Sequence, residues 1–331
     1  MTIIKGKGGI EAEVLLGTTS PYTCFPAIWT LRLKFPRFIL AQFSKHRMFS
    51  FNSTSSRAVS IPKMLKKMEQ NPMTPVYWGK SQKGMTGEHG HNALLTDGEG
   101  SNGYSVCLEN DKNQWGLTPE EAWDDAKNWS IAYAESYHKA GYHQEIPNRL
   151  LEPFQHIEII VTATDWYNFF ALRLAPDAQG EIQELARAMK QAIDTYHMQW
   201  PRMGCHIPMV SDDEVYEWGP DLAMKVSAAR CCTISYYNHK GEPMGVESAE
   251  KLYNHLVHND GQVHATPLEH QAIVPNGLQY GIITSTQEHL SSLVDAGSSD
   301  KFRSDVERKI KQLEYFANFH GWVSNRYLIG Q

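Results

Sequence analysis

The sequence predicts an α/β (α+β) protein in which a mixed or antiparallel sheet is flanked by helices. Two patterns indicate strands: residues 29–35 alternate apolar and polar side chains, and residues 157–162 form a β-branched run. Apolar residues at helical spacing over 182–196 indicate a strong helix after Pro176-Asp177. At 331 residues the chain can bury a large core, and we treat residues 1–331 as a single domain.

Another helix is expected after Thr118, which is followed by Pro119 at the first helical position and Glu121 at the third. This helix should end near Gly141. Its expected buried side consists of apolar residues at helical spacing: Ala122, Trp123, Ala126, Trp129 and Tyr133.

The remaining segments are assigned by composition and periodicity. Residues 72–116 are rich in Gly, Asn, Ser and Pro, which predicts a loop-rich insertion. Residues 200–220 are interpreted as a connector, because prolines and glycines surround a short acidic run. Apolar spacing predicts helices over 248–258 and over 299–319, the second being a C-terminal helix.

Bulk composition excludes several classes of protein. The formal net charge of -6 disfavours sequence-independent binding to long nucleic acid, which usually requires a basic domain. No run of about 18 apolar residues occurs, so no membrane span is expected. The five cysteines form no CxxC pair, and the first residues lack the apolar region of a secretory signal. We therefore expect reduced thiols and a cytoplasmic location, which is the host cytoplasm if the gene belongs to a phage.

A local positive charge contrasts with this acidic total. Residues 14–68 contain nine Lys and Arg and no Asp or Glu. The field indicates an anionic ligand, and phosphate fits best. Ser55, Ser56 and Arg57 together offer hydroxyls and a guanidinium, which predicts either a phosphate cradle or a solvated serine-rich turn. Gln42 is either a partner for an amide-like base edge or an ordinary polar strand residue.

Three further groups carry chemistry. Arg149 and Arg173 each lie among apolar residues, and each therefore needs a bound phosphate or a structural ion pair. Residues 264–270 hold two histidines and a glutamate, but Pro267 and the spacing differ from HExxH. A polar loop lining a cofactor is favoured there, and no metal site is predicted. No GxGxxG, P-loop or GxSxG motif is present.

Together these blocks resemble the flavin-dependent thymidylate synthases, the ThyX family. The hallmark Arg-His-Arg followed by Ser, Asn, Ser and Arg is matched within residues 45–57 as Lys-His-Arg, Ser, Asn, Ser and Arg. A second family block is matched by residues 168–173 and 178–182. A third is matched by residues 264–270, preceded by the Ala-Arg segment at 228–232.

The order of these blocks differs from that of ordinary members. Here the blocks run 29–67, 148–199 and 227–275, so the chain resembles a circularly permuted, phage-type member. The resemblance implies a homotetramer with active sites between subunits and a small-molecule nucleotide substrate. It also implies FAD, NADPH that reduces the flavin, and 5,10-methylenetetrahydrofolate as the one-carbon donor.

The resemblance also assigns roles to residues. It implies FAD contacts for Lys45, His46, Arg47, Asn52, Asn168, Thr266 and Glu269. It implies nucleotide contacts for Gln42, Ser55, Ser56, Arg57, Arg149 and Arg173. The residues it implies for the chemistry are Arg173, Ser55 and His264. The chain departs from the family pattern at Lys45, Ser53, Ala58 and Asp177.

Three functions are compatible with these observations. The first is conversion of dUMP to dTMP by a flavin-dependent thymidylate synthase. The second is a hydroxymethylase acting on dUMP or dCMP, in which water captures the activated one-carbon unit. The third is a non-catalytic protein that kept the scaffold and binds nucleotides or nucleic acid. Flavin content and the mass of the nucleotide product distinguish the three.

Overall fold

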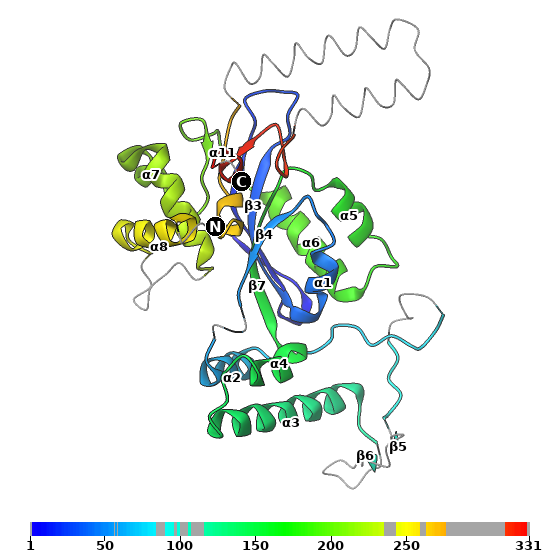
Figure 1. Cartoon of the computed structure of the whole chain (residues 1–331). Coiled ribbons are helices and arrows are strands. Elements are labelled where there is room, and N and C mark those ends of the chain that lie inside the picture. The colour runs from blue at the N-terminus through cyan, green and yellow to red at the C-terminus, as the bar shows by residue number, and fades with distance from the viewer. Residues whose placement is uncertain are drawn as a thin grey trace, which may run out of the picture.

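The centre of the molecule is a five-stranded antiparallel sheet in the order β1-β2-β3-β7-β4 (Figure 1). The computed structural model describes residues 2–55, 57, 59–83, 90–95, 98–99, 105–106, 116–234, 243–258, 263–275 and 315–329. The strands are β1 (Ile3–Lys5), β2 (Glu11–Thr18), β3 (Ile28–Pro36), β4 (Ser50–Ser53) and β7 (His156–Ala163). The predicted fold class and both predicted strands are confirmed, and the sheet is antiparallel throughout.

One face of this sheet is covered by helices that follow β3 and β7 in the sequence (Figure 1). These elements are η2 (Arg37–Ile39), α1 (Leu40–Phe43), α5 (Tyr167–Arg173) and α6 (Gly180–Thr195). Leu31 and Val161 of the sheet pack in one fully buried cluster with Ile182 and Leu185 of α6. The helix predicted from the 182–196 spacing is therefore confirmed, and its apolar side forms the main core.

The opposite face is covered by segments from the last third of the chain. Ile160 and Leu15 of the sheet pack there against Met209, Cys231 and Ile234. The covering elements are β8 (Cys205–His206), α7 (Asp212–Cys232), α8 (Val246–His258), η5 (Thr266–Glu269), β9 (Ala272–Ile273), β12 (Val323–Ser324) and α11 (Asn325–Leu328). α8 confirms the helix predicted near 248–258. Parts of the chain that are distant in sequence thus enclose the same strands.

A third layer of helices caps the end of the sheet where β7 begins (Figure 1). It comprises α2 (Ile61–Gln70), α3 (Pro119–Lys139), α4 (Pro147–Leu151) and η4 (Glu152–Phe154). The predicted start of α3 is confirmed, because Thr118 Oγ1 accepts from the Glu121 amide at 3.2 Å and Glu121 Oε2 accepts from the Thr118 amide at 2.8 Å. Met64, Leu151 and Phe154 form the small core of this layer.

The predicted buried side of α3 is wrong from Ala126 onward, because Ala126, Trp129 and Tyr133 are all exposed. Trp129 is 61% exposed and Tyr133 is 60% exposed, whereas Ala134 is fully buried. Trp123 is half-buried and packs against Phe154. The layer beneath α3 is small and covers only a narrow side of the helix, so the large aromatic residues of its central turns face outward.

Two other expectations need correction. The 200–220 connector is shorter than predicted, because α7 begins at Asp212 with a capping box between Ser211 and Glu214. The predicted helix over 299–319 is wrong at its end: β10 (Tyr315–Phe316) and β11 (Phe319–His320) form a hairpin there, with Ala317 at φ 62° in its turn. Residues 299–314 lie outside the described residues.

The predicted insertion at 72–116 is described only in part. Its described residues contain two short paired strands, β5 (Gly98–Glu99) and β6 (Ser105–Val106), and a bridge between Leu95 and Leu117. No helix occurs in those described residues. Elsewhere η1 (Lys7–Gly9) connects β1 to β2. No helix in the described ranges has the length and apolar character that a membrane crossing requires.

Candidate functional site

The predicted site residues lie in three groups around strand β4. The cationic motif does not directly follow β3, because η2 and α1 come between them. Gln42 is on α1, Lys45 to Arg47 occupy the turn after it, and the chain then enters β4. Ser55 and Arg57 follow the other end of the same strand. The motif that reads as continuous in sequence is therefore divided by a strand.

The first group centres on a contact between His46 and Arg173. The Nε of Arg173 donates to Nε2 of His46 at 3.0 Å, although the residues are 127 positions apart. The imidazole stands edge-on to the ring of Phe169, with centroids 4.9 Å apart, and lies beside Phe49. Because Nε2 accepts, the proton of a neutral His46 resides on Nδ1.

Burial, and then the nearby Arg173 charge, lower the pKa of His46. Burial also lowers the pKa of Arg173. The guanidinium nevertheless stays charged, because the ordinary pKa of arginine is very high. The pair therefore consists of a neutral imidazole and a cation. Among the described residues, the two Nη atoms of Arg173 make no hydrogen bond, so the outer edge of the guanidinium can contact an anion or a carbonyl.

The neighbours of this pair differ in whether their polar atoms already form hydrogen bonds or ion pairs within the chain. Gln42 donates through Nε2 to Oε1 of Gln179, so its amide is already held by the chain. Asn168, on the first turn of α5, is exposed. Lys45 and Arg47 are exposed too, and neither forms an ion pair within the described ranges. The turn thus presents two available cations beside a neutral histidine.

The second group lines a cavity of about 670 Å³ between α3 and α4, which we call the arginine cavity. Its lining residues are Arg57, Tyr137, Glu145, Ile146, Arg149 and Leu150. Arg57 Nε lies 3.4 Å from Glu145 Oε2, and Arg149 Nη1 lies 2.6 Å from Glu152 Oε1. Both arginines are exposed, and exposed pairs of this kind contribute little to stability. Two cations beside apolar side chains suit a phosphorylated ring compound.

The serines expected to act with Arg57 are not all in this cavity. Ser55 lies on the wall of a different cavity, between α2 and the sheet. Ser56, and the family departure at Ala58, lie outside the described residues. The structure therefore brings together Arg57 and Arg149, but it does not place Ser55 beside them.

The third group comprises His264, residues of η5, and Asn52 of β4, and η5 packs beside β4. His264 and Thr266 are exposed, while Glu269 is 9% exposed and pairs with Arg326. Asn52 of β4 donates through Nδ2 to the carbonyl oxygen of Cys231 at 2.8 Å. The amide nitrogen of Asn52 is thus used within the chain, and only its oxygen remains for a ligand.

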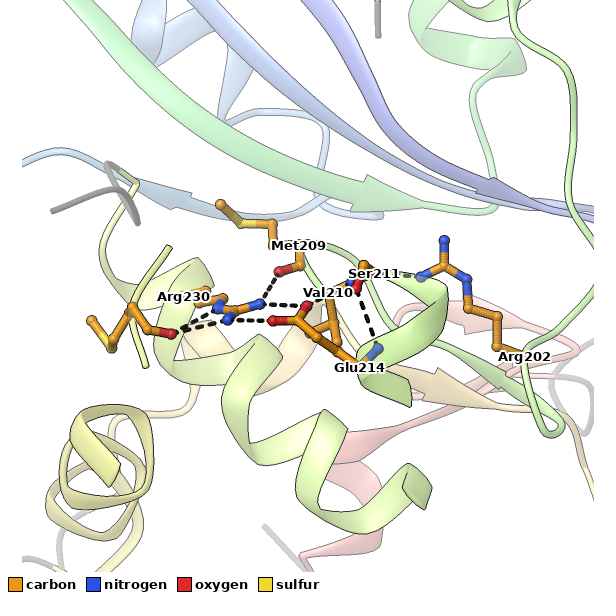
Figure 2. A network of polar contacts seen from close by, with 7 residues as sticks. Arg202, Met209, Val210, Ser211, Glu214 and Arg230 are labelled. Atoms are coloured by element: carbon orange, nitrogen blue, oxygen red, sulfur yellow. Dashed lines mark hydrogen bonds and ion pairs between the residues drawn. The ribbon is translucent and has the colours of Figure 1, made fainter. Parts of the chain in front are cut away.

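Arg230, the residue before Cys231 in the Ala-Arg segment, lies in a buried network of polar contacts (Figure 2). Arg230 is 2% exposed and pairs with both carboxylate oxygens of Glu214 at 3.0 and 2.8 Å. It also donates to the carbonyl oxygens of Met209 at 2.9 Å and Met244 at 2.9 and 3.2 Å. Burial alone would raise the pKa of Glu214, but hydrogen bonds from Arg230 and Ser211 outweigh it and lower that pKa.

A buried polar chain behind β4 was not predicted from the sequence. Thr18 and Thr30 bond the two ring nitrogens of His206 at 2.7 and 2.9 Å, and Thr30 also bonds Thr162 at 2.7 Å. Thr162 in turn bonds Nδ1 of His270 at 2.9 Å. Both histidines are fully buried, and burial lowers their pKa values to about 3. The only local sequence signal of these buried hydrogen bonds is a threonine within each largely apolar strand.

Together these features indicate what kind of ligand the protein can bind. An antiparallel α/β scaffold with an arginine cavity, a His46–Arg173 pair and exposed cations has the charges and donors that an anionic ligand requires. The family model described as thymidylate synthase complementing protein matches residues 26–197, more than half of the chain. The chain belongs to this family, the flavin-dependent thymidylate synthases. No curated protein matches the sequence.

Proposed function

We propose that the protein is a flavin-dependent thymidylate synthase that converts dUMP to dTMP. In this reaction methylenetetrahydrofolate donates the one-carbon unit and NADPH reduces FAD. The observation that carries the proposal is the His46–Arg173 pair, because both residues lie in the range matched by the family model and meet across 127 positions. A histidine and an arginine held at 3.0 Å supply a rigid, charged edge for a polar ring.

The side chains around His46 fit the chemistry of FAD. Its diphosphate needs cations and hydrogen-bond donors, and Lys45 and Arg47 are exposed with no ion pair in the described part of the chain. Asn168 is exposed on the first turn of α5, and the Asn52 oxygen accepts no hydrogen bond in the described part of the chain. When bound, the flavin supplies the redox chemistry of the reaction. The chain's own residues would orient it and shield its ring.

The nucleotide would engage two arginine sites. Arg57 and Arg149 would hold its phosphate, displacing Glu145 from its long contact with Arg57. Arg173 would place its free Nη edge against a pyrimidine carbonyl and stabilise the negative charge that develops on the ring. His46 keeps the guanidinium in that orientation by accepting from Nε. Gln42, Ser55, Ser56 and the exposed His264 would complete the contacts to nucleotide and folate.

We propose that the active sites form between subunits of a homotetramer. The arginine cavity contains none of the residues of the His46–Arg173 pair, yet one nucleotide must reach both. A second copy could supply the missing half. The outward face of α3, with Trp129, Tyr133 and Tyr137, offers apolar surface for such a contact and adjoins this cavity through Tyr137.

We also propose that the blocks are circularly permuted. The family model ends at residue 197, and the Ala-Arg and His-Thr-Pro segments follow it in the sequence. These late segments are nonetheless in contact with β4 through η5 and through the Asn52 contact to Cys231. Permutation leaves such contacts unchanged, because it alters only the order in which the chain connects them.

A product assay tests the proposed reaction. Purified protein is supplied with FAD, NADPH, methylenetetrahydrofolate and dUMP, and the nucleotide product is identified by mass spectrometry. The expected product is dTMP. A hydroxymethylated nucleotide would assign the chain to the hydroxymethylase alternative, with dCMP as a second substrate to test. Absence of FAD binding and of dUMP-dependent NADPH oxidation would refute both enzymatic readings.

A further inference from the structure

A second cavity lies between α2 and the end of the sheet where β3 ends and β7 begins, and we call it the α2 cavity. Its volume is about 160 Å³. Its lining residues are Lys34, Arg37, Thr54, Ser55, Val59, Met64, Lys67, Met68, Gln70, Asn71, Gln155, His156 and Glu158. None of them lines the arginine cavity. The α2 cavity is therefore a separate compartment on the same layer of the molecule.

The most informative group in the α2 cavity is Gln155. Its side chain is 3% exposed, and its Nε2 is buried without a hydrogen-bond partner among the described residues. A buried amide left without a partner costs about 1–3 kcal/mol, so a partner such as a ligand atom or an ordered water is expected for it. A ligand that brings a carbonyl oxygen to Nε2 would remove this cost.

The other walls define what else the ligand carries. Met64 and Met68 are 7% and 3% exposed and form an apolar, polarisable surface suited to a flat ring. Glu158 offers carboxylate oxygens that form no ion pair in the described ranges. Lys67 is exposed at the end of α2 and likewise has no ion pair in those ranges. The cavity thus provides a buried donor, an acceptor and a nearby cation.

The remaining cations of the cavity form ion pairs within the chain. Lys34 Nζ lies 3.3 Å from Glu11 Oε1, and Arg37 Nη2 lies 3.1 Å from Glu152 Oε1. Glu152 Oε1 also pairs with Arg149, so this single carboxylate is shared by two arginines. An inorganic anion would leave the apolar methionine wall uncovered, whereas a ring with a polar edge fits both that wall and the buried Gln155 amide.

The volume of the α2 cavity and the polar groups on its walls together indicate which ligand fits. A cavity of about 150 Å³ is known to hold one benzene ring, so 160 Å³ suits a single ring and not a three-ring system. A donor and an acceptor on the walls match a lactam edge, which presents one carbonyl and one N–H. We propose that the α2 cavity is a second nucleotide site that takes a pyrimidine base, with the phosphate directed toward Lys67.

The position of the α2 cavity connects it to the arginine cavity. Thr54, on its wall, donates to the carbonyl oxygen of Glu158 through its amide at 3.0 Å and its hydroxyl at 3.3 Å. The chain continues from Thr54 through Ser55 to Arg57. A base bound against Thr54 and Ser55 would therefore contact the start of the segment that positions Arg57.

Binding stoichiometry tests this proposal without any catalytic step. Full-length protein is titrated calorimetrically with dUMP in the absence of folate and NADPH. We expect two equivalents per chain. The double variant Arg57→Ala/Arg149→Ala should retain the equivalent bound in the α2 cavity. Adding Met68→Trp to this double variant should abolish that equivalent, because the indole fills the α2 cavity. A single equivalent that the double arginine variant abolishes would overturn the proposal.

Variants of exposed residues keep the test independent of folding. Lys67→Ala should weaken the second equivalent about tenfold, as expected for loss of one charge-assisted phosphate contact, while free uracil should bind unchanged. Lys66→Ala, a neighbouring exposed cation that does not line the cavity, is the matched control and should have no effect. Displacement of the second equivalent by inorganic phosphate, with no binding of uracil, would show an anion site only and refute the base site. Failure of the proposed reaction would leave this stoichiometry unchanged.

Discussion

Arg230 and Arg57 show two opposite uses of the same side chain. Arg230 is 2% exposed, and all three of its guanidinium nitrogens donate to Glu214 or to backbone carbonyls. Arg57 has a side chain that is 67% exposed and a single long contact of 3.4 Å to Glu145 in the described part of the chain. An arginine whose donors are all used within the chain stabilises the fold. One whose donors remain available can bind a ligand.

Arg173 lies between these extremes. It is half-buried, and its Nε donates a hydrogen bond to His46. Its Nη atoms form no hydrogen bond among the described residues. This arrangement fixes the direction of the guanidinium while leaving its charge for a ligand. The comparison therefore predicts that substitution of Arg230 affects stability, that of Arg57 affects binding, and that of Arg173 affects turnover.

The largest effect is expected for Arg230→Met. Removing one partner of a buried ion pair leaves Glu214 charged and uncompensated, which typically costs about 3–5 kcal/mol in the free energy of unfolding. Urea denaturation followed by circular dichroism measures this loss. The double variant Arg230→Met/Glu214→Leu should recover much of it. If Arg230→Met unfolds at the wild-type urea concentration, the structural role is refuted.

Arg173→Ala should lower turnover by about 10²–10³-fold, as observed when one donor to a developing negative charge is removed. The free energy of unfolding should change little, because only the hydrogen bond to His46 is lost. Initial rates at saturating dUMP and a urea titration measure the two quantities. Arg187→Ala, an exposed arginine of α6 that pairs with Glu184, is the matched control. Full activity in Arg173→Ala contradicts the assignment.

Arg57→Ala should weaken dUMP binding by about 2 kcal/mol, the expected effect of losing a charge-assisted phosphate contact. Calorimetric titration of the first equivalent measures this change. Glu145→Gln removes the competing carboxylate and should bind dUMP at least as tightly as the wild type. An unchanged affinity in Arg57→Ala would exclude the arginine cavity as the phosphate site.

The buried histidines predict a pH dependence of stability that is separate from binding. His206 and His270 have pKa values near 3 in the folded chain and ordinary values of 6.5 when unfolded. The unfolded state therefore binds more protons between these values, and stability falls as the pH drops from about 6.5 toward 3. The slope is up to about 1.4 kcal/mol per pH unit for each histidine. His270→Gln should reduce this slope, and an unchanged slope would contradict neutral burial.

Local periodicity made part of this fold predictable. β3 and α6 were predictable because each has a face in the core and another that is more exposed, whereas β7, which is buried on both faces, was predictable from its β-branched run. β2 was not assigned, because every residue from Ala12 to Thr18 is buried and the sequence shows no alternation. Residues Trp129 and Tyr133 illustrate the converse limit: helical spacing identifies an apolar side of a helix but not what, if anything, covers it.

The sequence identified candidate residues of the site, but it did not show how they are arranged in space. The charge pattern and the family blocks selected His46, Arg57, Arg149 and Arg173, but only the fold shows that His46 contacts Arg173 while Arg57 and Arg149 line one cavity. The role of Arg230 could not be derived because its partners come from distant carbonyls and a carboxylate. The capping box that begins at Ser211 was readable in the sequence, but the glycine and proline at 219–220 suggested a connector instead.

The claim that one active site combines the arginine cavity of one subunit with the His46–Arg173 pair of another can be tested by mixing two inactive variants. Arg57→Ala and Arg173→Ala proteins are unfolded together, refolded as hybrids, and assayed for dTMP formation. If the two arginines act across a subunit boundary, some hybrid sites contain both native residues, and activity should return to a substantial fraction of the wild-type rate. If no activity returns although hybrids form, both arginines serve the same chain and the account is contradicted.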